Sequence, residues 1–176
     1  MELRKVTKQD YPAVKKLYLS AFPARERKPF FMLMQKRHEP GVLVLEEDGF
    51  CGFISLITWQ DVMYVDYFAV DPGLRGKKLG SRALEELKKR YPDHRIMLEI
   101  ERLDEQADNN EQRIRRRKFY ERSAFEGHDN YVRAMNCEFE LLCWNGDVAF
   151  GEYKAIQKQA FGSLVYGLMK KPVERS

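Results

Sequence analysis

Cysteine is scarce in this sequence, and the few cysteines are not grouped. The 176 residues include three, Cys51, Cys137 and Cys143, an odd number with neither a C-x-x-C pair nor a His-rich zinc spacing. This pattern argues against a disulfide framework and against a structural zinc site. We therefore expect reduced thiols in the core and no metal cofactor.

Long apolar runs are also missing. No stretch approaches the roughly 18 apolar residues that a membrane-spanning helix needs. The sequence opens with Glu2, Arg4 and Lys5 ahead of any apolar segment, unlike the start of a secretory leader. We expect no membrane partner and a cytoplasmic protein.

No segment is rich enough in glycine, serine or proline to read as a linker, and there is no internal repeat. A chain of 176 residues is long enough to bury a sizeable core, so we predict a single domain over residues 1–176.

Charge of one sign is not in large excess either, because 31 Lys and Arg face 27 Asp and Glu for a net charge of +4. That balance is unlike a strongly basic nucleic-acid-binding domain.

Hydrophobic periodicity predicts strands that come first, followed by strands that alternate with helices. This order predicts an α/β fold of the α+β type, with a mixed, mostly antiparallel twisted sheet and helices on both faces. A hairpin turn is expected at residues 47–49, and a closing pair of strands is expected to join near 135–136. The predicted strands are 2–6, 42–46, 51–59, 61–71, 95–101, 131–134 and 137–144, and the predicted helices are 9–21, 30–36, 80–91, one led by Asn109 or Asn110 that runs to about Tyr120, and 150–161.

The most informative segment is residues 70–81, VDPGLRGKKLGS. An apolar strand stops at Asp71, and a basic loop containing glycines then opens into a helix with one apolar face. The first turn of a helix has N–H groups without backbone partners, and the helix dipole adds positive charge there. The spacing matches neither the Walker loop nor the dinucleotide-binding fingerprint. We therefore predict a phosphate-binding loop of another kind.

This loop resembles the acyl-CoA signature of the GNAT acetyltransferase superfamily, [QR]-x-x-G-x-[GA], beginning at Arg75. Lys78 stands where the family usually has its middle glycine. The resemblance implies that backbone N–H groups of the loop bind the pyrophosphate of acetyl-CoA. The residues implied are Arg75, Gly76, Lys77, Lys78, Leu79, Gly80 and Ser81.

Two further segments extend the resemblance. Residues 95–101 end in Leu-Glu-Ile-Glu, and residues 119–125 read FYERSAF, which is similar to the family's second landmark, Phe-Tyr-Glu-x-x-Gly-Phe. Ala124 replaces the usual glycine, which predicts a less sharp or displaced turn. Residues 21–30 are similar to a segment of bacterial GNAT proteins of unassigned substrate, in the region that caps the acceptor pocket in the family. Together these segments imply the GNAT acyl-CoA N-acyltransferase fold.

The resemblance assigns catalytic roles to two residues. Tyr120 matches the tyrosine that protonates the leaving CoA thiolate, and a phenol with a pKa of about 10 keeps its proton better than a thiol at about 8.5. The structural alternative is an aromatic anchor beside Phe119. Asp66 is the candidate base, because an alkyl amine with a pKa of about 10.4 must lose a proton before it attacks. The alternatives are Glu99, Glu101 or a water chain for the base, and for Asp66 itself a structural pairing with Arg or Lys.

Three more positions come only from the resemblance. The backbone at Phe68 is expected to bind the acetyl carbonyl, and Val70 is expected to pair with the pantetheine arm like an added strand. Their side chains would equally suit the core. Asn110, or Asn109, is expected to hydrogen-bond the pantetheine amides.

Residues 113–122 form a basic run with a competing interpretation as a nucleic-acid-binding surface. Acidic residues at 111, 121 and 126 dilute the run, and its aromatic residues, Phe119 and Tyr120, are adjacent to each other and not interleaved with the basic ones as a stacking platform would need. We interpret it as a mainly solvated helix face from which an arginine meets the 3′-phosphate of CoA, and we expect no nucleic-acid partner.

The predicted function is transfer of the acetyl group of acetyl-CoA directly to a primary amine, of a small molecule or a peptide, in a ternary complex. The alternatives are another acyl group and a catalytically silent acyl-CoA-binding or regulatory module. The sequence does not identify the acceptor. A homodimer through residues 137–144 is left open.

Overall fold

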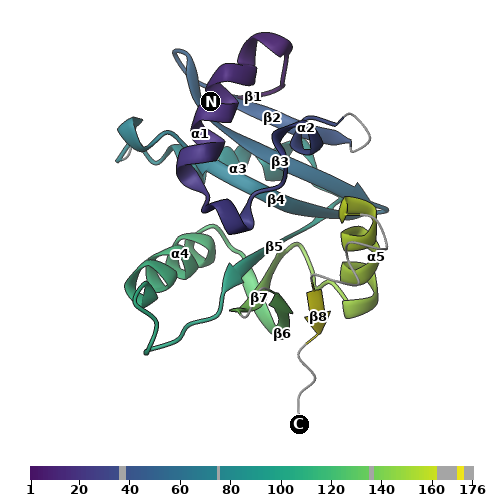
Figure 1. Ribbon diagram of the computed structural model, residues 1–176. Coiled ribbons are helices and arrows are strands. Elements are labelled where there is room, and N and C mark those ends of the chain that lie inside the picture. The colour runs from purple at the N-terminus through teal and green to yellow at the C-terminus, as the bar shows by residue number, and fades with distance from the viewer. Residues whose placement is uncertain (36–38, 75, 135–136, 162–169, 173–176) are drawn as a thin grey trace. The chain divides into compact units, whose positions relative to one another are not determined.

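The computed structural model describes residues 1–35, 39–74, 76–134, 137–161 and 170–172 (Figure 1). Its strands follow the order β1-β2-β3-β4-β5-β7-β6-β8. The chain divides into two compact units, residues 1–58 with 65–93 and residues 59–64 with 94–176. Strand β4 (Val62–Val70) contributes to both units. The single-domain expectation stays a prediction.

The first unit combines an antiparallel sheet with three helices. β1 pairs with β2, and β2 pairs with β3, both antiparallel. A tight turn at residues 47–49 joins β2 to β3, with Asp48 at φ 54° and Gly49 at φ 120°, as the sequence predicts. The elements of this unit are β1 (Glu2–Lys5), α1 (Tyr11–Ala21), α2 (Phe30–Leu33), β2 (Pro40–Glu46), β3 (Phe50–Trp59) and α3 (Leu79–Arg90), with 3-10 turns at Lys8–Asp10, Ala24–Glu26 and Pro72–Leu74.

Strand alternation gives this unit a core on each face of its sheet. Val42 and Val44 of β2 lie in a cluster with Val14 and Tyr18 of α1, whose spacing puts them on one helix face. Leu43, between the two valines, is also fully buried and points to the opposite face, which α3 covers (Figure 1). Helices on both faces of a mostly antiparallel sheet confirm the predicted architecture.

Gly52 of β3 allows β4 to approach closely. A Cβ atom at this position would lie 2.3 Å from the Ala69 carbonyl oxygen and 3.0 Å from the Val70 Cα. Both contacts are with backbone, so a side chain here could be accommodated only by moving β4. The approach therefore fixes the end of β4, where the loop to α3 begins.

The second unit is built on β5 (Arg95–Glu101), which pairs in parallel with residues 62–64 of β4 and antiparallel with β7 (Cys137–Trp144). β6 (Glu126–Ala134) pairs antiparallel with β7 and with β8 (Lys170–Pro172). Two helices belong to this unit, α4 (Asn110–Arg122) and α5 (Phe150–Phe161). Because β7 has strands on both edges, it cannot extend its sheet into a second copy of the chain.

Most predicted elements are present, and the bounds of β5, β7 and α5 coincide with the predictions. The helix predicted for 30–36 ends at Leu33, and its last predicted residue lies outside the described part of the chain. β6 begins at Glu126, earlier than residue 131, and β8 was not predicted. The expected connection at 135–136 also lies outside the described residues. Among the residues that are described, no helix has both the length and the apolar character to cross a membrane.

The turn after α4 differs from expectation. Ala124 adopts φ 57°, the left-handed conformation that glycine adopts at low cost. The amide of Ala124 donates to the Glu121 carbonyl (2.9 Å), and the amide of Phe125 donates to the Tyr120 carbonyl (3.0 Å). The turn is therefore sharp and in place, and the prediction of a relaxed turn was wrong.

We expect Ala124→Gly to raise the free energy of unfolding by about 0.5–1 kcal/mol, because glycine removes the cost of a left-handed alanine. Urea-induced unfolding measures the change. The matched control is Ala13→Gly in α1 (Tyr11–Ala21), which should lower stability by about 1 kcal/mol because glycine is a poor helix former. A loss of stability for both variants would contradict the strain at Ala124.

Candidate active site

The loop between β4 and α3 is braced at its start by Asp71. The Asp71 amide donates to the Cys51 carbonyl on β3 (2.8 Å). The Asp71 side chain accepts from the Gly73 amide (2.8 Å), and its carbonyl accepts from the Leu74 amide (3.0 Å). These bonds form an Asx turn and hold the first half of the loop in one conformation.

The second half of the loop leaves the N-terminus of α3 open. Gly76 has φ 86° and Lys78 has φ 55° and ψ 23°, both in the left-handed region. Lys78 precedes the first helical residue, but its side chain does not cap the helix, and the first turn of α3 carries no acidic residue. Uncapped N–H groups and the positive end of the helix dipole make this end of α3 suited to an anion.

The side chains of the loop leave that end accessible. Gly76, Lys77 and Lys78 are exposed, Gly80 and Ser81 are half-buried, and Leu79 points into the core. Lys78 takes the backbone conformation that a glycine would take, with its side chain directed to solvent. Arg75 lies outside the described residues, so its role stays a prediction.

Asp66 on β4 forms a nearly buried ion pair with Lys28. The Lys28 ammonium donates to both carboxylate oxygens (2.9 and 2.8 Å), and the side chains of Lys28 and Asp66 are 11% and 6% exposed. Lys28 Nζ also lies 5.8 Å from the centre of the Tyr67 ring. This pairing is the structural alternative to a catalytic Asp66. Phe68 and Val70 further along β4 are half-buried.

The segment around Lys28 is fastened to β4 through tyrosines. The Tyr67 hydroxyl donates to the Glu26 carbonyl (2.7 Å) and accepts from the Lys28 amide (3.2 Å). The Tyr18 hydroxyl donates to the Lys28 carbonyl (3.0 Å), and the Tyr18 and Tyr67 rings meet edge to face at 5.0 Å. Burial raises the pKa of Tyr67, so its hydroxyl stays protonated. The segment that resembles the family's pocket cap is thus held rigidly.

Sequence reasoning missed Lys28, Tyr18 and Tyr67. A buried carboxylate on an otherwise apolar strand requires a nearby cation. Lys28 lies within residues 21–30, the segment that resembles the family's pocket cap, and was therefore a candidate partner for Asp66. Phe30, at the end of this segment, packs against the core cluster. Phe31 is 66% exposed.

Tyr120 on α4 lies in the second unit, in an aromatic group. Its ring is 4.9 Å from the centre of Phe119 and 5.9 Å from that of Phe125, edge to face in both cases. Burial raises the pKa of Tyr120 to about 12, and Arg116 offsets part of that rise. The hydroxyl is therefore fully protonated at neutral pH, as a proton donor must be.

The start of α4 contains both candidate asparagines. Asn109 uses both ends of its amide within the protein, because Nδ2 donates to Glu101 (3.3 Å) and Oδ1 accepts from Arg113 Nε (2.9 Å). Asn110 accepts through Oδ1 from the Asp104 amide (3.2 Å). Asn110 thus has the less engaged side chain of the two.

The rival carboxylates of β5 hold helices in place. Glu99 Oε1 accepts from the hydroxyls of Tyr64 and Tyr153 (both 3.0 Å) and from Gln157 Nε2 (2.9 Å). Tyr153 and Gln157, both on α5, are completely buried. Glu101 pairs with α4 in a similar way, through Asn109, Arg113 and Arg116.

The basic run of α4 is less solvated than we expected. Arg113 and Arg116 pair with Glu101, and Arg117 pairs with Glu140 of β7 and with Glu121. Arg115 does face solvent. Much of the positive charge is therefore used to attach α4 to the sheet. In the described part of the chain, no group of three or more His, Cys, Asp or Glu side chains is arranged to hold a metal ion.

We expect Lys28→Met to lower the free energy of unfolding by about 3 kcal/mol, because it leaves the Asp66 carboxylate nearly buried without its counter-ion. The double variant Lys28→Met/Asp66→Leu should recover most of that loss. Urea-induced unfolding is the measurement. Lys89→Met, which removes an exposed pair with Glu86, is the control and should have little effect. A Lys28→Met protein as stable as the control would contradict the pairing.

Comparison with known proteins places the chain in a family. Residues 11–125 match the sequence profile of the Acetyltransferase (GNAT) family. The Bacillus subtilis (strain 168) protein named "Putative acetyltransferase YjbC" is 29% identical over 131 residues, which cover 70% of this chain and 66% of that protein, just under two thirds of its length.

Solved structures agree on the fold. A Bacteroides thetaiotaomicron protein described as "Putative acetyltransferase from GNAT family" is 25% identical, with a TM-score of 0.76 over 95% of this chain and 99% of that one. An aminoglycoside 6'-N-acetyltransferase complexed with coenzyme A shares the fold at 15% identity, with a TM-score of 0.61 over 82% of this chain and 96% of that one. From the profile match and this fold, the chain belongs to the acetyltransferase (GNAT) family.

Proposed function

We propose that the protein is an N-acetyltransferase that moves the acetyl group of acetyl-CoA directly to a primary amine in a ternary complex. The observation that carries the proposal is the open N-terminus of α3 behind Gly76 and Lys78, both at positive φ. Family membership and the related structure complexed with coenzyme A support acetyl-CoA as the donor.

In this proposal the loop binds the pyrophosphate through backbone N–H groups, and charge from exposed lysines assists. The backbone of Val70 pairs with the pantetheine arm, the backbone at Phe68 donates to the acetyl carbonyl, and Asn110 bonds the pantetheine amides. A donor aimed at the developing oxyanion contributes several kcal/mol in enzymes that depend on one, about 3–4. The residues assigned to the pyrophosphate are Arg75, Gly76, Lys77, Lys78, Leu79, Gly80 and Ser81.

The chemical step forms one bond and breaks another. The neutral amine nitrogen attacks the acetyl carbon, and the carbonyl electrons move to the oxygen. When the tetrahedral intermediate collapses, the carbon–sulfur bond breaks, Tyr120 gives its proton to the departing thiolate, and the proton that the attacking nitrogen loses restores the phenol. A phenol with a pKa of about 12 keeps its proton until the sulfur carries negative charge.

The base that removes the amine proton is the least constrained part of the proposal. We assign it to Asp66, with Glu99, Glu101 or a water chain as alternatives. For Asp66 to act, Lys28 must leave the carboxylate or the acceptor amine must take its place, because both carboxylate oxygens already accept from the Lys28 ammonium. Glu99 and Glu101 are held by hydrogen bonds of their own, so a water chain is the alternative that these bonds do not hinder.

A catalytically silent CoA-binding module was the alternative, suggested by Lys78 and Ala124 in place of glycines. Both residues adopt the left-handed backbone that glycine would adopt. Neither replacement therefore changes the chain path of its motif, and neither favours the silent module.

Calorimetric titration with acetyl-CoA should give micromolar binding, and Arg75→Ala and Gly80→Asp should each weaken it about tenfold or more, as expected for lost or opposed charge at a phosphate. Gly151→Asp is the matched control, because Gly151 is the second residue of α5 as Gly80 is of α3, and it has open space around it. No binding by the unaltered protein, or equal weakening by Gly151→Asp, would contradict the loop assignment.

Tyr120→Phe should lower kcat by roughly 100-fold, the usual contribution of a general acid, and leave acetyl-CoA affinity unchanged. Because the pKa of Tyr120 is raised to about 12, the unaltered enzyme should lose no activity below about pH 10 through ionisation of this residue. Steady-state kinetics from pH 6 to pH 10 test both points. Tyr11→Phe is the matched control. If Tyr120→Phe has the same kcat and pH profile as the unaltered enzyme and as Tyr11→Phe, Tyr120 is not the acid.

A further inference from the structure

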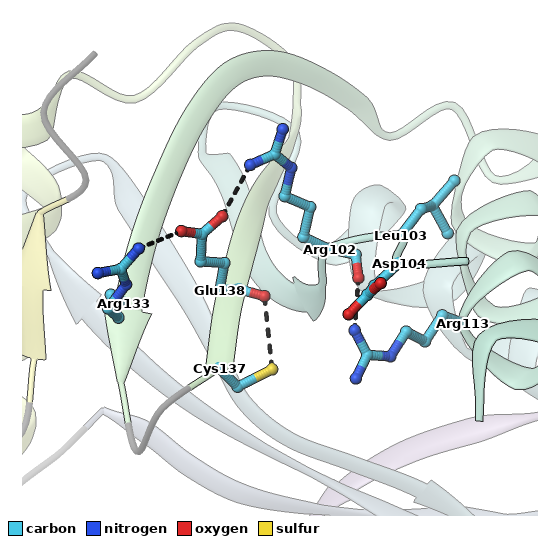
Figure 2. Close-up of a pocket in the computed structure, with 7 residues that line it drawn as sticks. All are labelled: Arg102, Leu103, Asp104, Arg113, Arg133, Cys137 and Glu138. Carbon is cyan, nitrogen blue, oxygen red and sulfur yellow. Dashed lines mark hydrogen bonds and ion pairs between the residues drawn. The ribbon is translucent and has the colours of Figure 1, made fainter. Parts of the chain in front are cut away.

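A charged pocket of about 600 Å³ lies in the second unit, and none of its lining residues has a role in the proposed acetyl transfer. Figure 2 shows its lining, which comes from the segment that follows β5, from α4, and from the facing ends of β6 and β7. The volume is that of a small-molecule site. The lining residues are Arg102, Leu103, Asp104, Arg113, Arg133, Cys137 and Glu138.

Positive charge predominates in this lining, with three guanidinium groups against two carboxylates. Glu138 lies between two of the arginines: its Oε2 accepts from Arg102 Nη1 (2.7 Å) and its Oε1 accepts from Arg133 Nη2 (2.5 Å). Hydrogen bonds from Arg133 and then Arg102 lower the pKa of Glu138. Glu138 is thus ionised at neutral pH, and the lining still keeps one positive charge in excess.

The two arginines that flank Glu138 remain accessible. Their side chains are 52% exposed for Arg102 and 61% for Arg133. A guanidinium has five N–H donors, and the pairing with Glu138 uses one from each arginine. Each therefore has donors left to offer a ligand while its partner stays in place.

The pocket is also preorganised. The Arg102 guanidinium carbon lies 4.7 Å from the centre of the Tyr131 ring, a stacking contact that limits its rotation. Arg113 is mostly buried and fixed, because its Nη1 donates to the Arg102 carbonyl (2.7 Å) and its Nε donates to Asn109. Positive groups held in position before a ligand arrives lose little freedom on binding.

We propose that this pocket binds a small oxyanion, the carboxylate or phosphate group of a small-molecule ligand, through residues other than those of the acetyl-CoA loop. Arg102 and Arg133 supply the hydrogen bonds, since the planar guanidinium matches both oxyanions. Arg113 adds a third guanidinium to the lining, one that also pairs with Glu101. Glu138 already shows how an oxyanion fits between the two outer arginines, and it competes with the ligand for them.

The test is calorimetric titration of the full chain, without acetyl-CoA and at low ionic strength, using inorganic phosphate and succinate as probes. Arg133→Gln should weaken binding of the preferred probe about tenfold, as expected for one charge-assisted hydrogen bond. Glu138→Gln should strengthen it about as much, because the competing charge is gone. The probe that binds more tightly identifies the oxyanion.

Arg115→Gln is the control, since it removes one exposed positive charge from the same unit and should change probe affinity less than twofold. Acetyl-CoA affinity should be unchanged in Arg133→Gln. If neither the unaltered protein nor Glu138→Gln binds a probe saturably, the proposal is overturned. Equal weakening by Arg115→Gln, or a parallel loss of acetyl-CoA affinity in Arg133→Gln, would overturn it as well. Glu138→Gln keeps the test decisive even if Arg133→Gln fails to fold.

Discussion

One close backbone approach, between Gly52 of β3 and the end of β4, is the constraint on which the phosphate loop depends. It holds β4 near enough for the Asp71 amide to reach the β3 carbonyl of Cys51. Asp71 then organises the turn that follows, and the turn leads through Gly76 and Lys78 into α3. The open N-terminus of α3 thus depends on a series of local constraints, the first of which is the absence of a side chain at Gly52.

Four carboxylates on the strands each bind an element that covers the sheet. Asp66 holds the segment that contains Lys28, Glu99 holds α5, and Glu101 and Glu140 hold α4. A carboxylate oxygen that already accepts a hydrogen bond from a covering element is less available to the proton of an incoming amine. Asp66 can therefore act as the base only when Lys28 no longer occupies its carboxylate oxygens.

Local patterns predicted the strands and helices well, because apolar spacing depends on residues close in sequence. The bounds of β5, β7 and α5 are examples. Pairing between distant charges was not predictable: the arginines of α4 looked solvated because their partners, Glu101 of β5 and Glu140 of β7, lie on other elements. Ala124 was misjudged for a different reason, since its backbone conformation is imposed by the turn and not by alanine's own preference. Short β8 carries no periodic signal of its own.

The sharing of β4 between the two units has a consequence for the order of synthesis. Neither unit is a continuous piece of chain, because residues 59–64 of the second interrupt the first. A ribosome completes the first unit at residue 93, when the apolar residues Val62, Met63 and Tyr64 still lack their partner strand β5. Until that strand emerges, the nascent chain carries an unpaired apolar strand edge, which chaperones and other nascent chains can bind.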